Sequence, residues 1–293
     1  MTDDAVDLAA LTRLMAEVRP RLHRYCARMV GSVFDGEDVL QEALAKATEA
    51  LPAVGNLAKA EGWLFTIAHN TALDTLRRRK RRAEVVLEDD SSELPNTSPE
   101  ADSWVAATAS LATLMQLPVL QRATVVLTDV LEYSLSEVVD ILGTTLPAVK
   151  AALHRGRVRL KTLAHADAGP SPSLSAEEHV RLRSYAEHFN ARDFDALRNL
   201  LAEDVQLDLV NRRQLKGRKN VSVYFTRYGE TADWNFAPGL AEGRPALLVS
   251  NPADPAGTVN YVVLLEWSAG RITGIRDFHY ARYVKDGLAV AKC

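Results

Sequence analysis

The sequence predicts a multidomain chain in which two all-α regions, the second a helix-turn-helix, precede an α+β domain. Three observations predict this order. Apolar residues recur at helical spacing from Leu8 to Arg82, and residues 135–160 read as two helices joined by a turn. Residues 259–267 instead alternate apolar and polar side chains with a period of two, which is typical of a strand. Helices first and antiparallel strands afterwards indicate an α+β arrangement for the last region.

The composition is that of a folded protein and excludes several classes. Of the 293 residues, 47% are hydrophobic and 25% are charged, which argues against disordered, collagen-like and coiled-coil chains. No apolar run reaches the roughly 20 residues of a membrane helix, and the acidic N-terminus lacks the apolar segment of a secretory signal. The two cysteines, Cys26 and Cys293, fit a reducing cytosol. We therefore expect a cytoplasmic location, no membrane contact and no cofactor, and the histidines and cysteines show no spacing typical of metal ligands.

Charge is distributed unevenly along the chain. Residues 77–82 are six consecutive cations, residues 84–102 contain acids without a base, and residues 143–163 contain bases without an acid. Two cationic blocks on either side of an acidic spacer suggest two surfaces that meet one polyanion. Two solvated helix ends would give the same pattern, and charge alone leaves both interpretations open.

Changes of composition predict the domain boundaries. Helical periodicity covers residues 7–83 and 103–165, and linker-like segments rich in Ser, Pro and small residues occupy 84–102 and 166–175. The last domain is expected at 176–288. Its expected elements are helices at 176–190 and 193–202, extended segments at 205–210, 246–250, 259–267 and 271–284, and a hairpin turn at 268–271.

Residues 135–160 contain the strongest local signal. Gly143 suits the left-handed residue after a helix, Thr145 suits a cap, and Pro147 suits the first turn of the next helix. The period then directs four apolar residues inward: Leu146, Val149, Leu153 and Leu160. Four polar residues turn towards solvent: Lys150, His154, Arg155 and Arg157. These features predict a helix-turn-helix with a cationic second helix, although an ordinary helical hairpin fits the segment too.

Three motifs occur in order over roughly the first 165 residues. They are Asp35-Gly-Glu-Asp38-Val-Leu-Gln41-Glu42, Trp63-Leu-Phe-Thr-Ile-Ala68-His-Asn70-Thr-Ala72-Leu-Asp74, and Leu117-Pro118-x-x-Gln121-Arg122 before the helix-turn-helix. Together they resemble motifs of bacterial extracytoplasmic-function (ECF) sigma factors, group IV of the sigma-70 family. The family has a region 2 and a region 4, and the resemblance assigns them to 7–83 and 103–165.

The resemblance implies two partners, RNA polymerase core and promoter DNA. Family members dock the first motif on the clamp helices of the polymerase β′ subunit, which here implies Asp38, Gln41 and Glu42, all within one helical turn. For DNA it implies Asn70 beside the −10 base and phosphate contacts from Arg77, Arg78 and Arg79. In the helix at the −35 element it implies Lys150 and Arg155 for base readout, His154 as a contact or bystander, and Arg157 as a phosphate contact or solvated charge.

The last region resembles the SnoaL-like branch of the nuclear-transport-factor-2-like superfamily, a cone of curved sheet with helices over a pocket. Phe189-Asn-Ala-Arg-Asp193 and Ile275-Arg-Asp277-Phe-His279-Tyr-Ala-Arg282 are among the similar stretches. Strand alternation places Asp277 and His279 on one face and Tyr280 and Arg282 on the other. Asp277 and His279 are secondary candidates for acid/base catalysis, and a polar pair lining an inert or ligand-sensing cavity is the preferred alternative. Trp234 and Phe236 either close the pocket or belong to the core.

We therefore expect a sigma factor without catalytic activity, whose C-terminal domain modulates it in cis. A small-molecule ligand is an additional expectation for that domain. Two other classes fit the same motifs: a DNA-binding module fused to a SnoaL-like cyclase or hydrolase, and a one-component regulator that senses a ligand. Turnover that disappears in Asp277→Ala would favour the enzyme, and operator binding without polymerase would favour the regulator.

Overall fold

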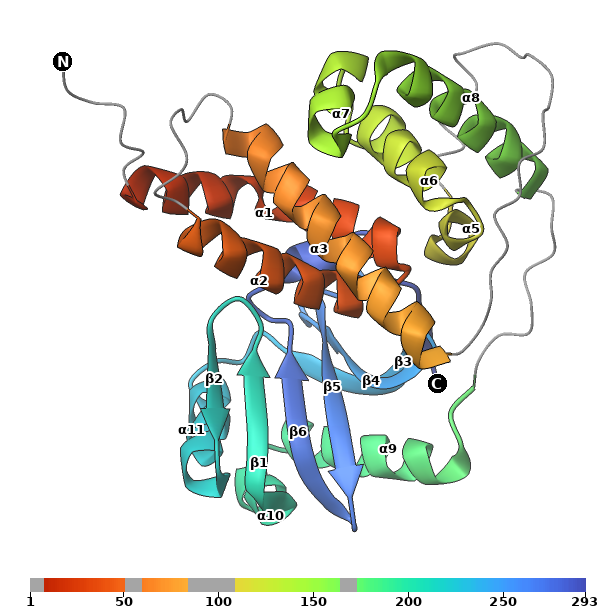
Figure 1. The fold of residues 1–293 in the computed structure, drawn as a ribbon. Helices are drawn as coiled ribbons and strands as arrows, with labels where there is room; N and C mark the ends of the chain where they lie inside the picture. The colour runs from red at the N-terminus through yellow and green to blue at the C-terminus, as the bar shows by residue number, and fades with distance from the viewer. Residues whose placement is uncertain (1–7, 51–59, 84–108, 164–172) are drawn as a thin grey trace. The chain divides into compact units, whose positions relative to one another are not determined.

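The chain forms two compact units, residues 1–167 and 168–293. The computed structural model describes residues 8–50, 60–83, 109–163 and 173–293 (Figure 1). Over these residues the expected fold class is confirmed, because the first unit is helical and the second is α+β. The predicted linker at 84–102 and most of the one at 166–175 lie outside the described residues. No described helix combines the length and the apolar character that crossing a bilayer requires.

Three long helices open the first unit and pack on one another (Figure 1): α1 (Leu8–Val30), α2 (Val33–Glu49) and α3 (Ala60–Ala83). Ser32 caps α2, because its hydroxyl accepts a hydrogen bond from the Asp35 amide at 3.3 Å. Gly36 fixes how closely α1 and α2 approach. A Cβ at Gly36 would lie 2.6 Å from the main chain of Ala27, so the two helices meet there without an intervening side chain.

The described part of the second helical region contains α5 (Leu111–Met115), α6 (Val119–Val125), a π-helical turn (Val126–Val130), α7 (Leu135–Leu142) and α8 (Leu146–Leu163). The predicted turn of the helix-turn-helix is confirmed. Gly143 is left-handed with φ 60° and ψ 40°, and the Thr145 hydroxyl accepts from the Ala148 amide at 3.4 Å. A reciprocal pair of hydrogen bonds between Ser134 and Glu137 begins α7.

The inward face of α8 differs from the prediction at one position. Val149, Leu153 and Leu160 are buried as expected, whereas Leu146 is 43% exposed. Leu146 is the first residue of α8, and the buried face of the helix begins one turn later, at Val149. The apolar period is confirmed from Val149 onwards, and the predicted buried face began one turn too early.

The two helical regions, expected as separate domains, share one apolar core in the structure. Polar contacts join them as well. The Tyr133 hydroxyl of the second region donates to Glu61 Oε1 of α3 at 2.6 Å, and Arg21 of α1 donates to the Leu131 carbonyl at 3.1 Å. Arg122 of α6 is 4% exposed and donates to the main-chain carbonyl of Met29 in α1. Residues 8–163 therefore pack as one body over their described part.

The second unit combines three helices with a seven-stranded sheet (Figure 1). The helices are α9 (Ala176–Asn190), α10 (Phe194–Asn199) and α11 (Arg218–Gly229). The strands are β1 (Leu201–Leu209), β2 (Arg213–Lys216), β3 (Asn235–Ala241), β4 (Arg244–Ser250), β5 (Tyr261–Ser268), β6 (Arg271–Asp277) and β7 (Val290–Lys292). Their order is β2-β1-β6-β5-β4-β3-β7, and all neighbours are antiparallel except β1 and β6, which are parallel.

An aromatic cluster forms the core between α9 and the sheet. Phe189 of α9 stacks on Phe236 of β3 with ring centroids 4.0 Å apart, and Trp234 meets the Phe189 ring at 5.1 Å. Trp234 and Phe236 are 8% and 2% exposed. Trp234 and Phe236 were predicted either to close the pocket or to belong to the core, and the structure places them in the core.

The sequence interpretation missed several elements of this unit. It assigned no structure to β2, α11 or β3, and β7 extends the sheet beyond the expected end at residue 288. It also extended the last strand to residue 284, whereas β6 ends at Asp277 and a 3-10 turn occupies Arg282–Lys285. The expected antiparallel sheet holds except at the β1–β6 pair, which is parallel. α11 and four other strands separate β1 from β6 along the chain, which provides the long connection that a parallel pair needs.

Candidate functional site

The predicted polymerase-docking residues lie on α2 but differ in how they are held. Asp38 is exposed and Gln41 is half-buried. The Gln41 amide donates to Glu37 Oε1 at 3.2 Å, and Glu37 is fully buried and paired with Arg19 of α1. Glu37 is therefore a structural acid, whereas Asp38, Gln41 and Glu42 lie on the part of α2 that a partner can reach.

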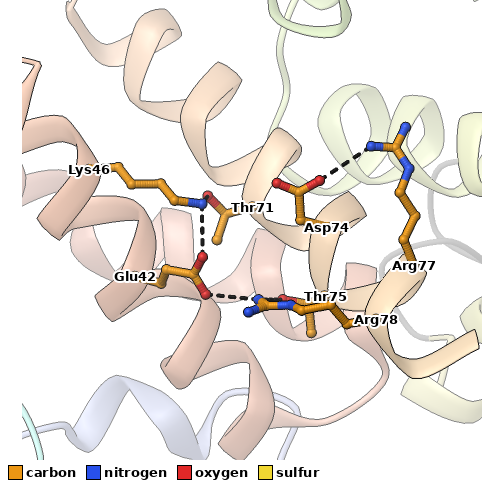
Figure 2. A network of polar contacts seen from close by, with 7 residues as sticks. All are labelled: Glu42, Lys46, Thr71, Asp74, Thr75, Arg77 and Arg78. Atoms are coloured by element: carbon orange, nitrogen blue, oxygen red, sulfur yellow. Dashed lines mark hydrogen bonds and ion pairs between the residues drawn. The ribbon is translucent and has the colours of Figure 1, made fainter. Parts of the chain in front are cut away.

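Glu42 connects this surface to α3 (Figure 2). Its carboxylate lies 2.8 Å from Lys46 Nζ and accepts from Arg78 Nη2 of α3 at 2.9 Å. The hydrogen bond from Lys46, followed by that from Arg78, lowers the pKa of the Glu42 carboxyl, so it is ionised at neutral pH. Arg78 also donates to the Thr75 hydroxyl at 2.9 Å.

The first three cations of the run 77–82 are all held by neighbouring groups. Arg77 pairs with Asp74 at 3.3 Å, Arg78 with Glu42, and Arg79 with Asp35 at 2.6 Å. Arg79 also donates to the Val30 carbonyl at 2.8 Å. The cations that follow are exposed and have no ion pair within the described part of the chain: Lys80, Arg81 and Arg82. The free positive charge of α3 is thus concentrated at its C-terminal end.

Asn70 is exposed on α3 between two buried neighbours. His69 is 7% exposed and Thr71 is 1% exposed. The Tyr25 hydroxyl and His69 Nδ1 lie 2.7 Å apart, and burial lowers the pKa of His69 to about 4. His69 therefore packs as a neutral residue against α1, Thr71 accepts a hydrogen bond from Lys46 of α2 at 3.3 Å, and Asn70 alone of the three is exposed.

The predicted DNA-binding residues of α8 fall into two groups. Lys150 and Arg155 are exposed, and His154 is half-exposed. Arg157 instead makes a bidentate ion pair with Asp129, with Nε to Oδ2 at 2.9 Å and Nη2 to Oδ1 at 2.5 Å. The side chain of Asp129 is 1% exposed and that of Arg157 is 17% exposed. Arg157 therefore neutralises a buried acid, a role that the sequence interpretation did not consider.

A separate cavity of about 160 Å³ lies in the second unit. Its lining includes Asp277 and His279, the two secondary catalytic candidates, together with Tyr224, Arg227 and Tyr228 of α11. Asp277 is fully buried, and its Oδ2 accepts from the hydroxyls of Tyr224 at 2.9 Å and Tyr228 at 2.8 Å. The His279 amide donates to Oδ1 at 2.8 Å. Burial raises the pKa of Asp277 against the opposing effect of these three donors.

His279 and its neighbour Tyr280 both line this cavity. Strand alternation predicted opposite faces for these two residues, and that prediction was wrong. Because β6 ends at Asp277, His279 and Tyr280 follow in a turn where the period of two no longer applies. His279 Nδ1 is buried without a hydrogen-bond partner in the described residues.

Comparison with known proteins finds two family models that match the first unit. The family models Sigma-70 region 2 and Sigma-70, region 4 match residues 14–82 and 110–160. ECF RNA polymerase sigma factor SigG of Mycobacterium tuberculosis is 32% identical over 213 residues, covering 64% of this chain and 57% of SigG. ECF RNA polymerase sigma factor SigM of the same organism is 33% identical over 162 residues, covering 54% of this chain and 79% of SigM.

The chain therefore belongs to the ECF RNA polymerase sigma factors. It spans only about 57% of the length of SigG. Among solved structures, the chain is similar to the crystal structure of the Mycobacterium tuberculosis extracytoplasmic function sigma factor SigJ. The match covers 91% of this chain and 95% of the SigJ chain, with 20% identity and a TM-score of 0.36.

Proposed function

We propose that this chain binds RNA polymerase core through α2 and directs it to promoters through α3 and α8. Membership of the ECF family supports this function, and the single observation that carries it is the arrangement of charge in the first unit. The acid-and-amide surface of Asp38, Gln41 and Glu42 suits a basic docking face such as the β′ clamp helices. The exposed cations of α3 and α8 suit the −10 and −35 elements of promoter DNA.

Within this proposal the DNA-binding residues have unequal roles. Asn70 on α3, and Lys150 and Arg155 on α8, are the exposed candidates for base contacts, with His154 beside them. Arg77, Arg78 and Arg79 contribute positive charge near phosphates while remaining anchored to nearby carboxylates. Arg157 supports α8 through Asp129 rather than reaching for DNA.

Charge reversal on α2 tests the polymerase contact. Asp38→Lys is expected to weaken binding to purified core polymerase at least tenfold, roughly 1.4 kcal/mol, because it places a cation opposite a basic face. Run-off transcription from a promoter library should fall with it. Glu49→Lys, an equal charge change at the exposed end of the same helix, is the matched control and should leave both nearly unchanged. A wild-type chain that neither binds core polymerase nor produces a defined start site would contradict the proposed function.

We further propose that the second unit modulates this activity in cis and is not itself catalytic. It is a compact unit of its own, and the linker before it directly follows α8. Truncation after residue 175 should change the yield of promoter-dependent transcription in the same run-off assay. Unchanged transcription would remove the regulatory role.

A second candidate function concerns the cavity around Asp277. A cavity of about 160 Å³ whose lining is mostly apolar, with an unpartnered His279 Nδ1, suits a small molecule of about one ring that carries a polar group. Single-ring alcohols, phenols and ketones can be screened for compounds that raise the melting temperature of the wild-type chain. Binding at this cavity predicts that the shift disappears in His279→Leu. Turnover of such a compound that is lost in Asp277→Ala would instead support the enzyme alternative.

A further inference from the structure

A short segment of the second unit concentrates positive charge. Residues 212–219 read Arg-Arg-Gln-Leu-Lys-Gly-Arg-Lys, five cations without an acid. Arg212 lies in the turn before strand β2, residues 213–216 form β2, and Arg218 and Lys219 begin α11. Nothing in the proposed roles of the first unit or of the cavity uses this segment.

The segment lies at the edge of the sheet (Figure 1). β2 is the first strand in the sheet order and pairs only with β1, with Leu209 opposite Arg213 and Gln206 opposite Lys216. Successive side chains of a strand point to opposite faces, but long side chains at an edge can extend around it from either face. Arg213 and Lys216 start from opposite faces of this edge strand, and both are exposed.

Most of these cations are available to a partner. Arg218 is engaged internally, because it donates to the Leu201 carbonyl at 3.1 Å and pairs with Glu203 at 2.8 Å. Four others are exposed and have no ion pair among the described residues; we name them the β2 basic strip: Arg212, Arg213, Lys216 and Lys219. The guanidinium of Arg212 lies over the Tyr280 ring at 5.4 Å, which fixes its position without neutralising it.

The dimensions of the strip suit a phosphate backbone. Residues 213 to 216 span about 10 Å at the rise of a strand. DNA carries one phosphate per strand for every 3.4 Å of helix axis, so a strip of this length laid along the axis faces about three phosphates of one strand. Positive charge spread along an edge favours phosphate contacts, which do not depend on base sequence.

The chain segment between α8 and α9 keeps the strip close to any DNA that α8 binds. α8 ends at Leu163 and α9 begins at Ala176, so the intervening chain extends at most about 45 Å. When α8 lies on DNA, the strip is therefore restricted to the surroundings of that DNA. A tether of this length corresponds to an effective concentration on the order of millimolar.

We propose that the β2 basic strip binds the phosphate backbone of promoter DNA close to the site occupied by α8. This inference rests on the proposed function, because it requires α8 to be bound to DNA. The strip adds affinity without adding sequence preference. It gives the second unit a direct contact through which a change in that unit alters promoter occupancy.

The salt dependence of promoter binding tests this contact. The full-length chain, assembled with core polymerase, is titrated with a fluorescent promoter duplex at several salt concentrations. The quadruple variant R212Q/R213Q/K216Q/K219Q is expected to bind roughly tenfold more weakly at low salt. Its slope of log K against log salt should fall by about 2 to 3, since each lost phosphate contact contributes about 0.9.

The control removes the same charge from elsewhere on the unit. R183Q/R282Q/K285Q/K292Q changes four exposed cations outside the strip and should alter the slope by less than about 1. Equal slopes for the two quadruple variants would overturn the inference. So would self-association of the strip variant with an unchanged slope, because edge cations also prevent pairing between sheets.

A third variant separates this inference from the proposed function. K150A/R155A should lose discrimination between promoter and random DNA, whereas the strip variant should retain it. Wild-type protein that shows no promoter preference with core polymerase would overturn the proposed function and the inference together. A promoter preference lost only in K150A/R155A, with a slope unaffected by the strip variant, would overturn the inference alone.

Discussion

Arg157→Ala is expected to destabilise the first unit by about 3 kcal/mol, although a resemblance of sequence would assign this arginine to DNA. Truncation leaves the carboxylate of Asp129 buried at 1% exposure without its bidentate partner. Breaking a buried ion pair by removing one member costs about 3–5 kcal/mol, because the remaining charge is neither solvated nor paired. Urea unfolding followed by circular dichroism measures the loss.

Arg155 provides the matched comparison two residues earlier on α8. Its side chain is exposed, so Arg155→Ala should change the unfolding free energy by less than about 0.5 kcal/mol. Promoter affinity should nevertheless fall about 5- to 30-fold, as expected for a lost base contact worth about 1–2 kcal/mol. The double variant Asp129→Ala/Arg157→Ala should regain part of the stability lost in Arg157→Ala. If Arg157→Ala is as stable as wild type and binds promoters weakly, Arg157 contacts DNA directly and the structural role is wrong.

The second large effect is expected at Arg122, which is 4% exposed where the two helical regions meet. Its guanidinium donates to the carbonyls of Leu117 at 3.0 Å and of Met29 in α1. Burial lowers its pKa to about 10, so the group remains charged at neutral pH and needs these acceptors. Arg122→Ala removes the donors from buried carbonyls and leaves a cavity. We expect a loss of about 3 kcal/mol in unfolding free energy.

Arg122→Lys sharpens the test. A lysine keeps the charge but lacks the planar fork that reaches several carbonyls at once, so most of the loss should remain. Gln116→Ala, an exposed change nearby, is the control and should be nearly neutral. Two separate unfolding transitions in the wild-type protein, one for each helical region, would contradict the shared core through which Arg122 acts.

Local signals explain what the sequence could predict about the fold. The helix expected at 176–190 coincides with α9, whose start is marked by reciprocal hydrogen bonds between Ser175 and Glu178. The turn after α7 was predicted because only a left-handed residue fits there and Gly143 supplies it. α11 was missed because Val221, Val223, Tyr224 and Phe225 favour strands, and its helix is stabilised by packing on β1 and β2.

The role of a candidate site residue was predictable when it depends on that residue's exposure alone. It was not predictable when it depends on a partner far away in the sequence. Lys150 and Arg155 are exposed, as the helical period predicts. Arg157 follows the same pattern, and only its pairing with Asp129, 28 residues earlier in the sequence, distinguishes it. A signal existed, because Asp129 is the single charge in the run from Val125 to Leu131 and an isolated buried acid needs a cation. Tyr224 and Tyr228 of the cavity could not be predicted, because the helix α11 on which they lie was not predicted either.

The contact between Gly36 and Ala27 has a consequence for the orientation of the docking surface. Because two main chains touch there, the crossing point of α1 and α2 is set by backbone thickness rather than by any replaceable side chain. Substitutions at Asp38 or Glu42 therefore change the chemistry of the surface that α2 presents to a partner protein, without changing the orientation of the helix. A methyl group at position 36, as in Gly36→Ala, would instead push α2 away from α1 and reorient the whole docking surface.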